Sequence, residues 1–295
     1  MTRLRLLIAL GSAVMCSAIL VTAAGSRSKT EAGAPGRATA GALASFDGSK
    51  KESRFLDFLQ TPRRPGNLLA RRGVAGYSAQ GRRIGVLQRG DPALDGEVLV
   101  FGCIHGDECA ASEIQPHPPA SGCPDPGSDI YLVPNLNPDG FALGTRLNGR
   151  GVDLNRNFPA AWRPIGERGD PQYSGPRPFS EPETRLAARI VRRLRPEVTI
   201  WFHQYGETRP LVRAWGQSIP AARRFAQLAK VPFRRLPWPA GTAPNWQNHR
   251  FPGTASFVVE LPRGPLADAA KWHLGRSIVR LARRVGDDDD VPGKR

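Results

Sequence analysis

Two side chains that can bind a metal ion lie close together in the sequence, directly after an apolar run. Residues 98–104 are apolar, and the chain continues with His105, Gly106, Asp107 and Glu108. Imidazole and carboxylate groups are good zinc ligands, and Gly106 eases the turn that would bring both groups to one ion. A catalytic zinc site usually has three protein ligands and one open position, so a third ligand has to come from elsewhere in the chain.

His203 is the best-placed third ligand, because it closes a second apolar run at residues 198–202. Taken alone, a histidine followed by an acid is a common pair, and a single histidine at a strand end is often a hydrogen-bonded core residue. The position of all three residues at strand ends favours a metal site. The other histidines lie in a proline-rich loop or lack an acidic neighbour in a matching context: His117, His249 and His273.

A longer pattern of polar residues lies between these ligand candidates. The chain reads N-P-D-G at residues 137–140, continues to Arg146, and reads G-V-D-L-N-R-N-F at residues 151–158. Glu260 follows inside a later apolar run. Together with the H-G-D-E turn, these segments closely resemble the zinc carboxypeptidases of the carboxypeptidase A type, and the similarity extends over residues 76–262.

The resemblance implies one Zn²⁺ per chain, bound by His105, Glu108 and His203, with a water whose pKa the ion lowers towards neutrality. Glu260 would be the catalytic carboxylate, which takes the proton of that water and delivers it to the leaving amine. Arg146 would stabilise the oxyanion of the intermediate, and losing such a donor typically costs about 3 to 4 kcal/mol of barrier.

The resemblance also implies roles for three residues of the G-V-D-L-N-R-N-F segment. Asn155 and Arg156 would hold the free carboxylate of the substrate, because a guanidinium can donate two parallel hydrogen bonds to a carboxylate. Asp153 would accept a proton from a ligand imidazole, here His105, and so fix its tautomer. The alternative for Asp153 is an ordinary turn aspartate. The expected enzyme therefore acts at chain ends.

The chain departs from the digestive carboxypeptidases in two places. Those enzymes carry a mobile tyrosine before the catalytic glutamate, whereas this chain has no tyrosine after Tyr205, and residues 241–246 take its place. The short core resembles bacterial murein-peptide amidases, which cleave the γ-D-glutamyl bond to diaminopimelate in peptidoglycan stem peptides. The second departure follows Ile114, where prolines interrupt the helix expected behind the first two ligands.

Short apolar runs bounded by turn residues predict buried strands at residues 83–87, 98–104, 130–133, 198–202 and 255–261. Helical patterns alternate with these runs. One predicted helix starts with a capping box of Ser180 and Glu183, and others cover residues 221–229 and 267–285. Such alternation is typical of an α/β domain. With the resemblance, we expect a single-domain zinc-carboxypeptidase-like fold, in which helices flank a central mixed, largely parallel sheet.

The chain divides into four regions. Residues 1–24 carry two arginines, an apolar run and small residues, which is the layout of a secretory signal peptide; an uncleaved membrane anchor is the alternative. Residues 25–72, rich in Gly, Ala, Ser and Arg, predict a linker or pro-region. Residues 73–286 would form the catalytic domain. Residues 287–295 predict an acidic, disordered tail.

The formal net charge of the whole chain is +16. The presumed signal contains two arginines and no acid, so the exported part would carry +14. Such a surface favours anionic partners, and outside the cell these are wall polymers and lipid head groups and not nucleic acid. Solvated helix faces are the alternative explanation. Export also allows one disulfide, and we expect Cys109 with Cys123, because Cys103 lies in a run typical of a buried strand.

The sequence therefore predicts a secreted or cell-wall-associated zinc metallocarboxypeptidase or amidase. Its substrate would be a peptide or a peptidoglycan-derived stem peptide, an anionic wall polymer would be a further partner, and membrane contact would require an uncleaved N-terminal segment. Two alternatives stay open. One is a zinc deacylase of the aspartoacylase or succinylglutamate desuccinylase kind, and the other is a non-catalytic wall-binding module.

Overall fold

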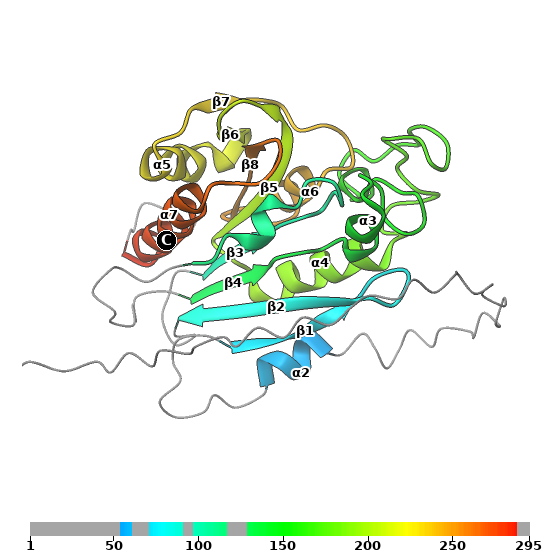
Figure 1. Cartoon of the computed structure of the whole chain (residues 1–295), viewed down its shortest axis with the longest axis horizontal. Coiled ribbons are helices and arrows are strands. Elements are labelled where there is room, and N and C mark those ends of the chain that lie inside the picture. Colours follow the sequence, from blue (N-terminus) through cyan, green and yellow to red (C-terminus); the bar gives the residue numbers. More distant parts are fainter. Residues whose placement is uncertain (1–53, 61–70, 91–96, 117–128, 288–295) are drawn as a thin grey trace, which may run out of the picture. The chain divides into compact units, whose positions relative to one another are not determined.

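A single sheet, whose strands send alternate side chains to two buried faces, forms the centre of the fold. The computed structural model in Figure 1 describes residues 54–60, 71–90, 97–116 and 129–287. Within these ranges eight strands pair in the order β1-β2-β4-β3-β5-β8-β6-β7. Their bounds are β1 Arg71–Tyr77, β2 Arg83–Gly90, β3 Glu97–Phe101, β4 Asp129–Val133, β5 Val198–Glu207, β6 Leu211–Ala214, β7 Phe233–Arg235 and β8 Ala255–Pro262.

The sheet is mixed, with a parallel centre. Strands β4, β3, β5 and β8 run parallel to one another, and β6 runs parallel to β7. The pairs β1 with β2, β2 with β4 and β6 with β8 are antiparallel. The predicted α/β fold with a mixed, largely parallel sheet is confirmed.

Helices cover both faces of this sheet. They are α2 Arg54–Gln60, α3 Pro138–Leu143, α4 Pro182–Leu194, α5 Ile219–Ala229, α6 Ala243–Arg250 and α7 Asp268–Asp287. Helices α5 and α7, which lie side by side in Figure 1, bury their apolar residues in one core, and α2, α4 and α6 contribute to the other. The central strands read as continuous apolar runs because both of their faces are covered.

Strand β3 shows how the alternation works. Val98 and Val100 belong to the core under α5 and α7, whereas Leu99 and Phe101 belong to the core under α4 and α6. Phe101 stacks on Trp201 of the neighbouring parallel strand, with ring centroids 4.1 Å apart. This packing fixes β3 and β5 side by side, so the segments that follow them leave the sheet at the same edge.

Part of the predicted linker belongs to the folded core. Helix α2 lies within the 25–72 region, and it buries Phe55 and Phe58 against β1, which already begins at Arg71. This stretch is therefore not a linker, and the boundary at residue 73 is too late. The predicted signal segment, the rest of the 25–72 region and residues 288–295 lie outside the described residues. Asp287, predicted as the first residue of the acidic tail, ends α7.

The predicted capping box is wrong. The N-cap of α4 is Glu181, and it makes no side-chain capping bond. The Ser180 hydroxyl donates to the Glu181 carboxylate instead, and Glu183 accepts a hydrogen bond from the backbone N–H of Ala79, 2.7 Å away. These residues serve a buried polar network, so they are not available to the helix end.

The interruption expected after Ile114 fits the structure, in which Ala110–Glu113 form only a 3₁₀ turn behind the two ligand candidates. Residues 117–128 lie outside the described part. No helix among the described residues has the length and apolar character needed to cross a membrane.

Candidate metal centre and active site

The first two ligand candidates lie on a tight loop between β3 and the 3₁₀ turn. Strand β3 ends at Phe101, earlier than predicted, because Cys103 adopts a left-handed backbone conformation with φ of 51°. The chain then turns through Gly106, where a Cβ atom would collide with the backbone of Gly140 and Phe141. A glycine is therefore required, and the turn places His105 and Glu108 on the same side.

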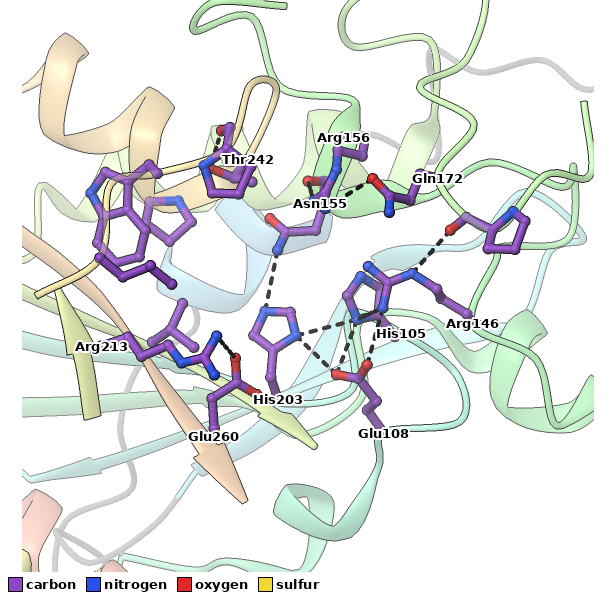
Figure 2. Close-up of a pocket in the computed structure, with 16 residues that line it drawn as sticks. His105, Glu108, Arg146, Asn155, Arg156, Gln172, His203, Arg213, Thr242 and Glu260 are labelled. Atoms are coloured by element: carbon purple, nitrogen blue, oxygen red, sulfur yellow. Dashed lines mark hydrogen bonds and ion pairs between the residues drawn. The ribbon is translucent and has the colours of Figure 1, made fainter. Parts of the chain in front are cut away.

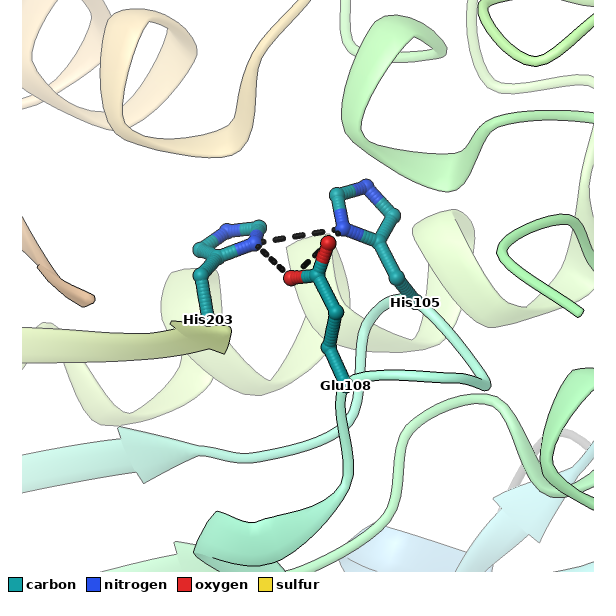
Figure 3. A group of neighbouring side chains, drawn as sticks. All are labelled: His105, Glu108 and His203. Atoms are coloured by element: carbon teal, nitrogen blue, oxygen red, sulfur yellow. Dashed lines mark hydrogen bonds and ion pairs between the residues drawn. The ribbon is translucent and has the colours of Figure 1, made fainter. Parts of the chain in front are cut away.

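Three candidate ligands meet at the edge of the sheet (Figure 3). The Oε2 atom of Glu108 lies 3.0 Å from Nδ1 of His105 and 2.9 Å from Nδ1 of His203. The two Nδ1 atoms are 3.2 Å apart. His203 comes from β5, so residues almost a hundred positions apart in the chain form one triangle of donor atoms.

Asp153 and Arg146 orient this triangle. The Asp153 carboxylate is fully buried, and its Oδ1 lies 3.1 Å from Nε2 of His105. Its Oδ2 accepts hydrogen bonds from Nε and Nη2 of Arg146, at 3.1 and 2.8 Å. Nη1 of Arg146 donates to Oε1 of Glu108 and faces Nδ1 of His105, both at 3.1 Å. Asp153 is thus a buried hydrogen-bond acceptor for a ligand and not merely a turn residue.

The charges of the cluster shift its pKa values in opposite directions. Burial opposes the ionisation of Glu108 and Asp153, but the neighbouring imidazole of His105 favours it more strongly. His203 adds to this effect at Glu108, and Arg146 adds to it at Asp153. The pKa of each carboxyl group therefore falls well below its usual range. Burial lowers the pKa of His105, yet Asp153 and Glu108 together raise it above its ordinary value. Both carboxylates therefore stay ionised and favour a cation at the centre.

The donor set fits a zinc ion. A guanidinium carries only donors, so the Nδ1 atom of His105 that faces Arg146 has to be an acceptor, and Nε2 then donates to Asp153. This is the tautomer that directs a free nitrogen lone pair towards Glu108 and His203. Two imidazole nitrogens and one carboxylate are the ligand types of a catalytic zinc site.

Glu260 faces the same centre from the neighbouring strand. In the parallel pair of β5 and β8, Glu260 is opposite His203. Its Oε2 atom is buried and has no hydrogen-bond partner among the described residues, while Oε1 lies 3.5 Å from Nη1 of Arg213. A buried carboxylate oxygen without a hydrogen bond lowers the stability of the fold. Its presence beside the metal centre therefore indicates that it interacts with a bound substrate or water.

These residues line one pocket of about 350 Å³ (Figure 2). Asn155 and Arg156 lie on its wall, where Arg156 donates to the backbone oxygen of Asn155 at 2.8 Å. Nδ2 of Asn155 lies 3.3 Å from Nε2 of His203, and its Oδ1 accepts from the N–H of Ala243 at 3.0 Å. The structure therefore brings every predicted site residue to one pocket, apart from Asp153, which lies buried behind His105.

A family model described as zinc carboxypeptidase matches residues 127–253. Over this stretch, which is less than half of the chain, the sequence is similar to the zinc carboxypeptidases. Murein peptide amidase A of Escherichia coli strain K12 is 40% identical over 84 residues, which are 25% of this chain and 35% of that protein. Human mast cell carboxypeptidase A is 30% identical over 122 residues, or 35% of this chain and 29% of that protein. The chain thus spans about a third of the length of these curated relatives.

Solved structures of zinc carboxypeptidases show the same fold. The murein-tripeptide amidase from Escherichia coli O157 has a TM-score of 0.56 at 25% identity, covering 75% of this chain and 93% of the other. Carboxypeptidase A from Helicoverpa armigera has a TM-score of 0.61 at 19% identity, covering 75% and 70%. Zinc is the metal for which the family is named, in agreement with the ligands His105, Glu108 and His203.

The expected pairing of Cys109 with Cys123 is wrong. The structure joins Cys103 to Cys109, with Cα atoms 4.4 Å apart, and Cys123 lies outside the described residues. The left-handed backbone at Cys103 takes it out of the strand and turns it towards the ligand loop. The disulfide thus encloses both His105 and Glu108.

Sequence reasoning did not identify several residues that line the pocket. They come from β6, from the segment before α6 and from the loop after the G-V-D-L-N-R-N-F segment: Arg213, Leu236, Trp238 and Gln172. No motif marks these residues. Arg213 lies beside Glu260 because of the register between β6 and β8, and this register is known only from the structure.

Proposed function

We propose that this chain is an exported zinc metallopeptidase that hydrolyses an amide bond next to a free carboxylate. The substrate would be a peptidoglycan stem peptide, cleaved at the γ-D-glutamyl bond to diaminopimelate. The observation that supports this most directly is the convergence of three metal-ligand candidates, the Glu260 carboxylate with its unbonded Oε2, and the side chains of Asn155 and Arg156 in one pocket.

The chemistry divides among these groups. When bound by His105, Glu108 and His203, zinc supplies Lewis acidity, which polarises the scissile carbonyl and makes water a stronger nucleophile. Oε2 of Glu260 is free of hydrogen bonds to the described residues, so it can accept a proton from the attacking water and later release it to the leaving amine. The carboxylate moves a proton between two groups that occupy the same part of the pocket.

Two arginines bind the negative charges of the substrate. Arg146 lies against His105 and Glu108, so its guanidinium would border the position at which the carbonyl oxygen becomes negative. Arg156 lies further along the pocket wall. Burial is the main cause that lowers the pKa of Arg156, and repulsion from Arg146 lowers it further, while attraction to Asp153 opposes both. It remains a cation at neutral pH, and it can hold the substrate carboxylate.

The stem-peptide assignment is supported by the relatives and by the missing tyrosine. A murein peptide amidase is among the relatives in both sequence and structure. The segment that replaces the tyrosine of the digestive enzymes forms the start of α6, and Thr242 and Pro244 line the pocket there. Residues 1–24 support export, and the charge of +16 supports contact with an anionic wall polymer.

One assay tests the proposal. The zinc-loaded protein is incubated with the stem tripeptide that ends in diaminopimelate, and the released amino acid is identified by mass. We expect free diaminopimelate. Replacing Glu260→Gln should abolish turnover while the zinc content stays at one per chain, and Glu167→Gln, at an exposed glutamate, should retain full activity.

Full activity of Glu260→Gln would disprove the mechanism. Preferential hydrolysis of N-acetyl-aspartate would favour a deacylase, and wall binding without any hydrolysis would favour a non-catalytic module.

A further inference from the structure

The pocket contains a third arginine that the proposed reaction does not use. Arg213 comes from β6, and Figure 2 shows it beside Glu260, on the other side of His203 from Arg146 and apart from Arg156. Its side chain is 19% exposed, so it is accessible from the pocket although most of it is buried. An arginine held in this position needs an explanation beyond surface charge.

The sheet register directs Arg213 into the pocket. In the antiparallel pair of β6 and β8, Arg213 lies opposite Val258, and Leu211 lies opposite Glu260. Paired residues on neighbouring strands point to the same face, and so do residues two apart on one strand. Arg213 therefore shares a face with Val258 and Glu260, both of which line the pocket.

This end of the pocket is the place for the side chain of the leaving residue. The scissile amide has to lie between the metal centre and Glu260, while the carboxylate of the leaving residue binds at Asn155 and Arg156. A separate hollow of about 420 Å³, which shares Glu108 and Arg146 with the pocket and extends to Gln204 and Arg263, can take the part of the substrate before the scissile bond. The side chain of the leaving residue would therefore bind in the part of the pocket around Arg213.

The surroundings of Arg213 strengthen an interaction with a second anion. The neighbours of Arg213 on the pocket wall include two apolar residues: Val258, which pairs with it on β8, and Leu236, whose N–H donates to the carbonyl oxygen of Ala214. A charge pair in such surroundings is screened less by water than one at the surface. The contact of Nη1 with Glu260 is 3.5 Å long, and a guanidinium has five N–H donors arranged in a fork, so Arg213 can bind a carboxylate while Glu260 stays beside it.

We propose that Arg213 is the specificity-determining residue that selects leaving residues with a second carboxylate on the side chain. This inference rests on the proposed function, because it assigns a substrate class to the same site. Diaminopimelate carries such a distal carboxylate. Lysine has the same chain and the same distal amine but lacks that carboxylate, so the two residues form a matched pair.

The test compares γ-D-glutamyl-diaminopimelate with γ-D-glutamyl-lysine as substrates of the zinc-loaded protein. Arg213→Gln should lower kcat/KM for the diaminopimelate substrate by about tenfold to a hundredfold, mainly through KM, because it removes a charged hydrogen bond. The lysine substrate should change by less than about threefold. Arg213→Lys should recover part of the preference. Arg235→Gln removes the same charge from an exposed residue of the adjacent strand β7 and should change neither substrate.

The ratio between the two substrates separates specificity from catalysis. Loss of Arg213 also alters the charge next to Glu260, and that effect would slow both substrates alike. An equal loss for both substrates, or no loss for either, overturns the inference. Zinc content and melting temperature of each variant check that the site is intact.

A binding measurement separates this inference from the proposed function. Calorimetry with free diaminopimelate and with free lysine, on the zinc-loaded protein, should show tighter binding of diaminopimelate, and Arg213→Gln should remove the difference. If the native protein shows this preference but hydrolyses neither peptide, the proposed function fails and the inference about Arg213 stands. Equal binding of the two amino acids by the native protein overturns the inference whether or not hydrolysis occurs.

Discussion

At the scale of single residues, one buried carboxylate connects a metal-ligand candidate to the arginine proposed to stabilise the transition state. Asp153 accepts hydrogen bonds from His105 on one oxygen and from Arg146 on the other. The same side chain therefore fixes the ring orientation of His105 and the position of the guanidinium that we propose faces the reacting carbonyl. Because Asp153 is completely buried, it cannot exchange these partners for water, and its contacts with His105 and Arg146 keep it ionised.

Replacing Asp153→Asn should weaken zinc binding by about tenfold to a hundredfold, because an amide cannot hold the N–H of His105 as strongly as a carboxylate can. Zinc affinity is measured by competition with a chromogenic chelator. Asp268→Asn, at a carboxylate that is 98% exposed, should leave the affinity unchanged. An unaltered zinc affinity in Asp153→Asn would show that the carboxylate does not support the ligand.

At the scale of elements, the loop between β3 and the 3₁₀ turn is tied by the disulfide on either side of two ligands. Cys103 precedes His105, and Cys109 follows Glu108 directly. A disulfide limits the conformations that the unfolded or metal-free segment can adopt, and a loop of this size corresponds to about 2 kcal/mol of stability. The bond thus keeps the two ligands in place before the metal binds.

The double variant Cys103→Ser/Cys109→Ser should lower the free energy of unfolding by about 2 kcal/mol and weaken zinc binding. Urea unfolding and chelator competition measure the two effects. Peptide mapping without reductant provides the control, since it should find Cys103 linked to Cys109 in the native protein. A link between Cys109 and Cys123 would contradict the structure and the expected loss.

A second element, the start of α4, carries a glutamate with an altered pKa. Burial, the largest cause, raises the pKa of Glu183 from 4.5 to about 7 against the hydrogen bonds from Ala79 and Asn148, and Glu181 adds to the rise. An acid whose pKa is higher in the folded state binds its proton more tightly there. The stability that it contributes is complete below pH 4.5 and is lost as the pH rises to about 7.

Glu183→Gln should therefore flatten the pH dependence of stability. Glutamine keeps the neutral form at every pH, so the melting temperature of the variant should fall less between pH 5 and pH 8 than that of the native protein. Scanning calorimetry at both pH values measures the difference. Glu167→Gln, at an exposed residue, should follow the native curve. A parallel fall for Glu183→Gln and the native protein would exclude this residue as the source.

The sequence predicts the central elements well because burial on both faces leaves long apolar runs, as in β3, β5 and β8. The short edge strands β6 and β7 carry arginines and only a few apolar residues, so no periodicity marks them. The disulfide could not be predicted because a left-handed turn at Cys103 interrupts an apolar run that otherwise continues to Ile104. The motif residues gather as the family resemblance implies, whereas Arg213 is placed by strand register alone.

At the scale of the whole molecule, positive charge dominates, and part of it gathers over buried aromatic rings. Arg192 lies over Trp246, and both Arg195 and Arg250 lie over Phe251. Burial lowers the pKa of Arg192, and repulsion from Arg250, Arg189 and Arg195 lowers it further. Because these positive charges repel one another, binding of an anion at this surface would lower their electrostatic energy. We call Arg192, Arg195 and Arg250 the arginine patch, and none of them lines the pocket.

The proposed contact with an anionic wall polymer should depend on this patch and on salt. Isolated cell walls should retain the protein at low ionic strength and release it as salt rises, because screening weakens exposed charge pairs. The triple variant Arg192→Gln/Arg195→Gln/Arg250→Gln should bind walls at least about tenfold more weakly. Arg234→Gln/Arg235→Gln/Arg284→Gln removes the same charge elsewhere and should bind nearly as the native protein does. Both variants should hydrolyse a soluble stem peptide at the native rate, because neither alters the pocket. Equal weakening in the two variants would mean that total charge, and not the arginine patch, holds the protein to the wall.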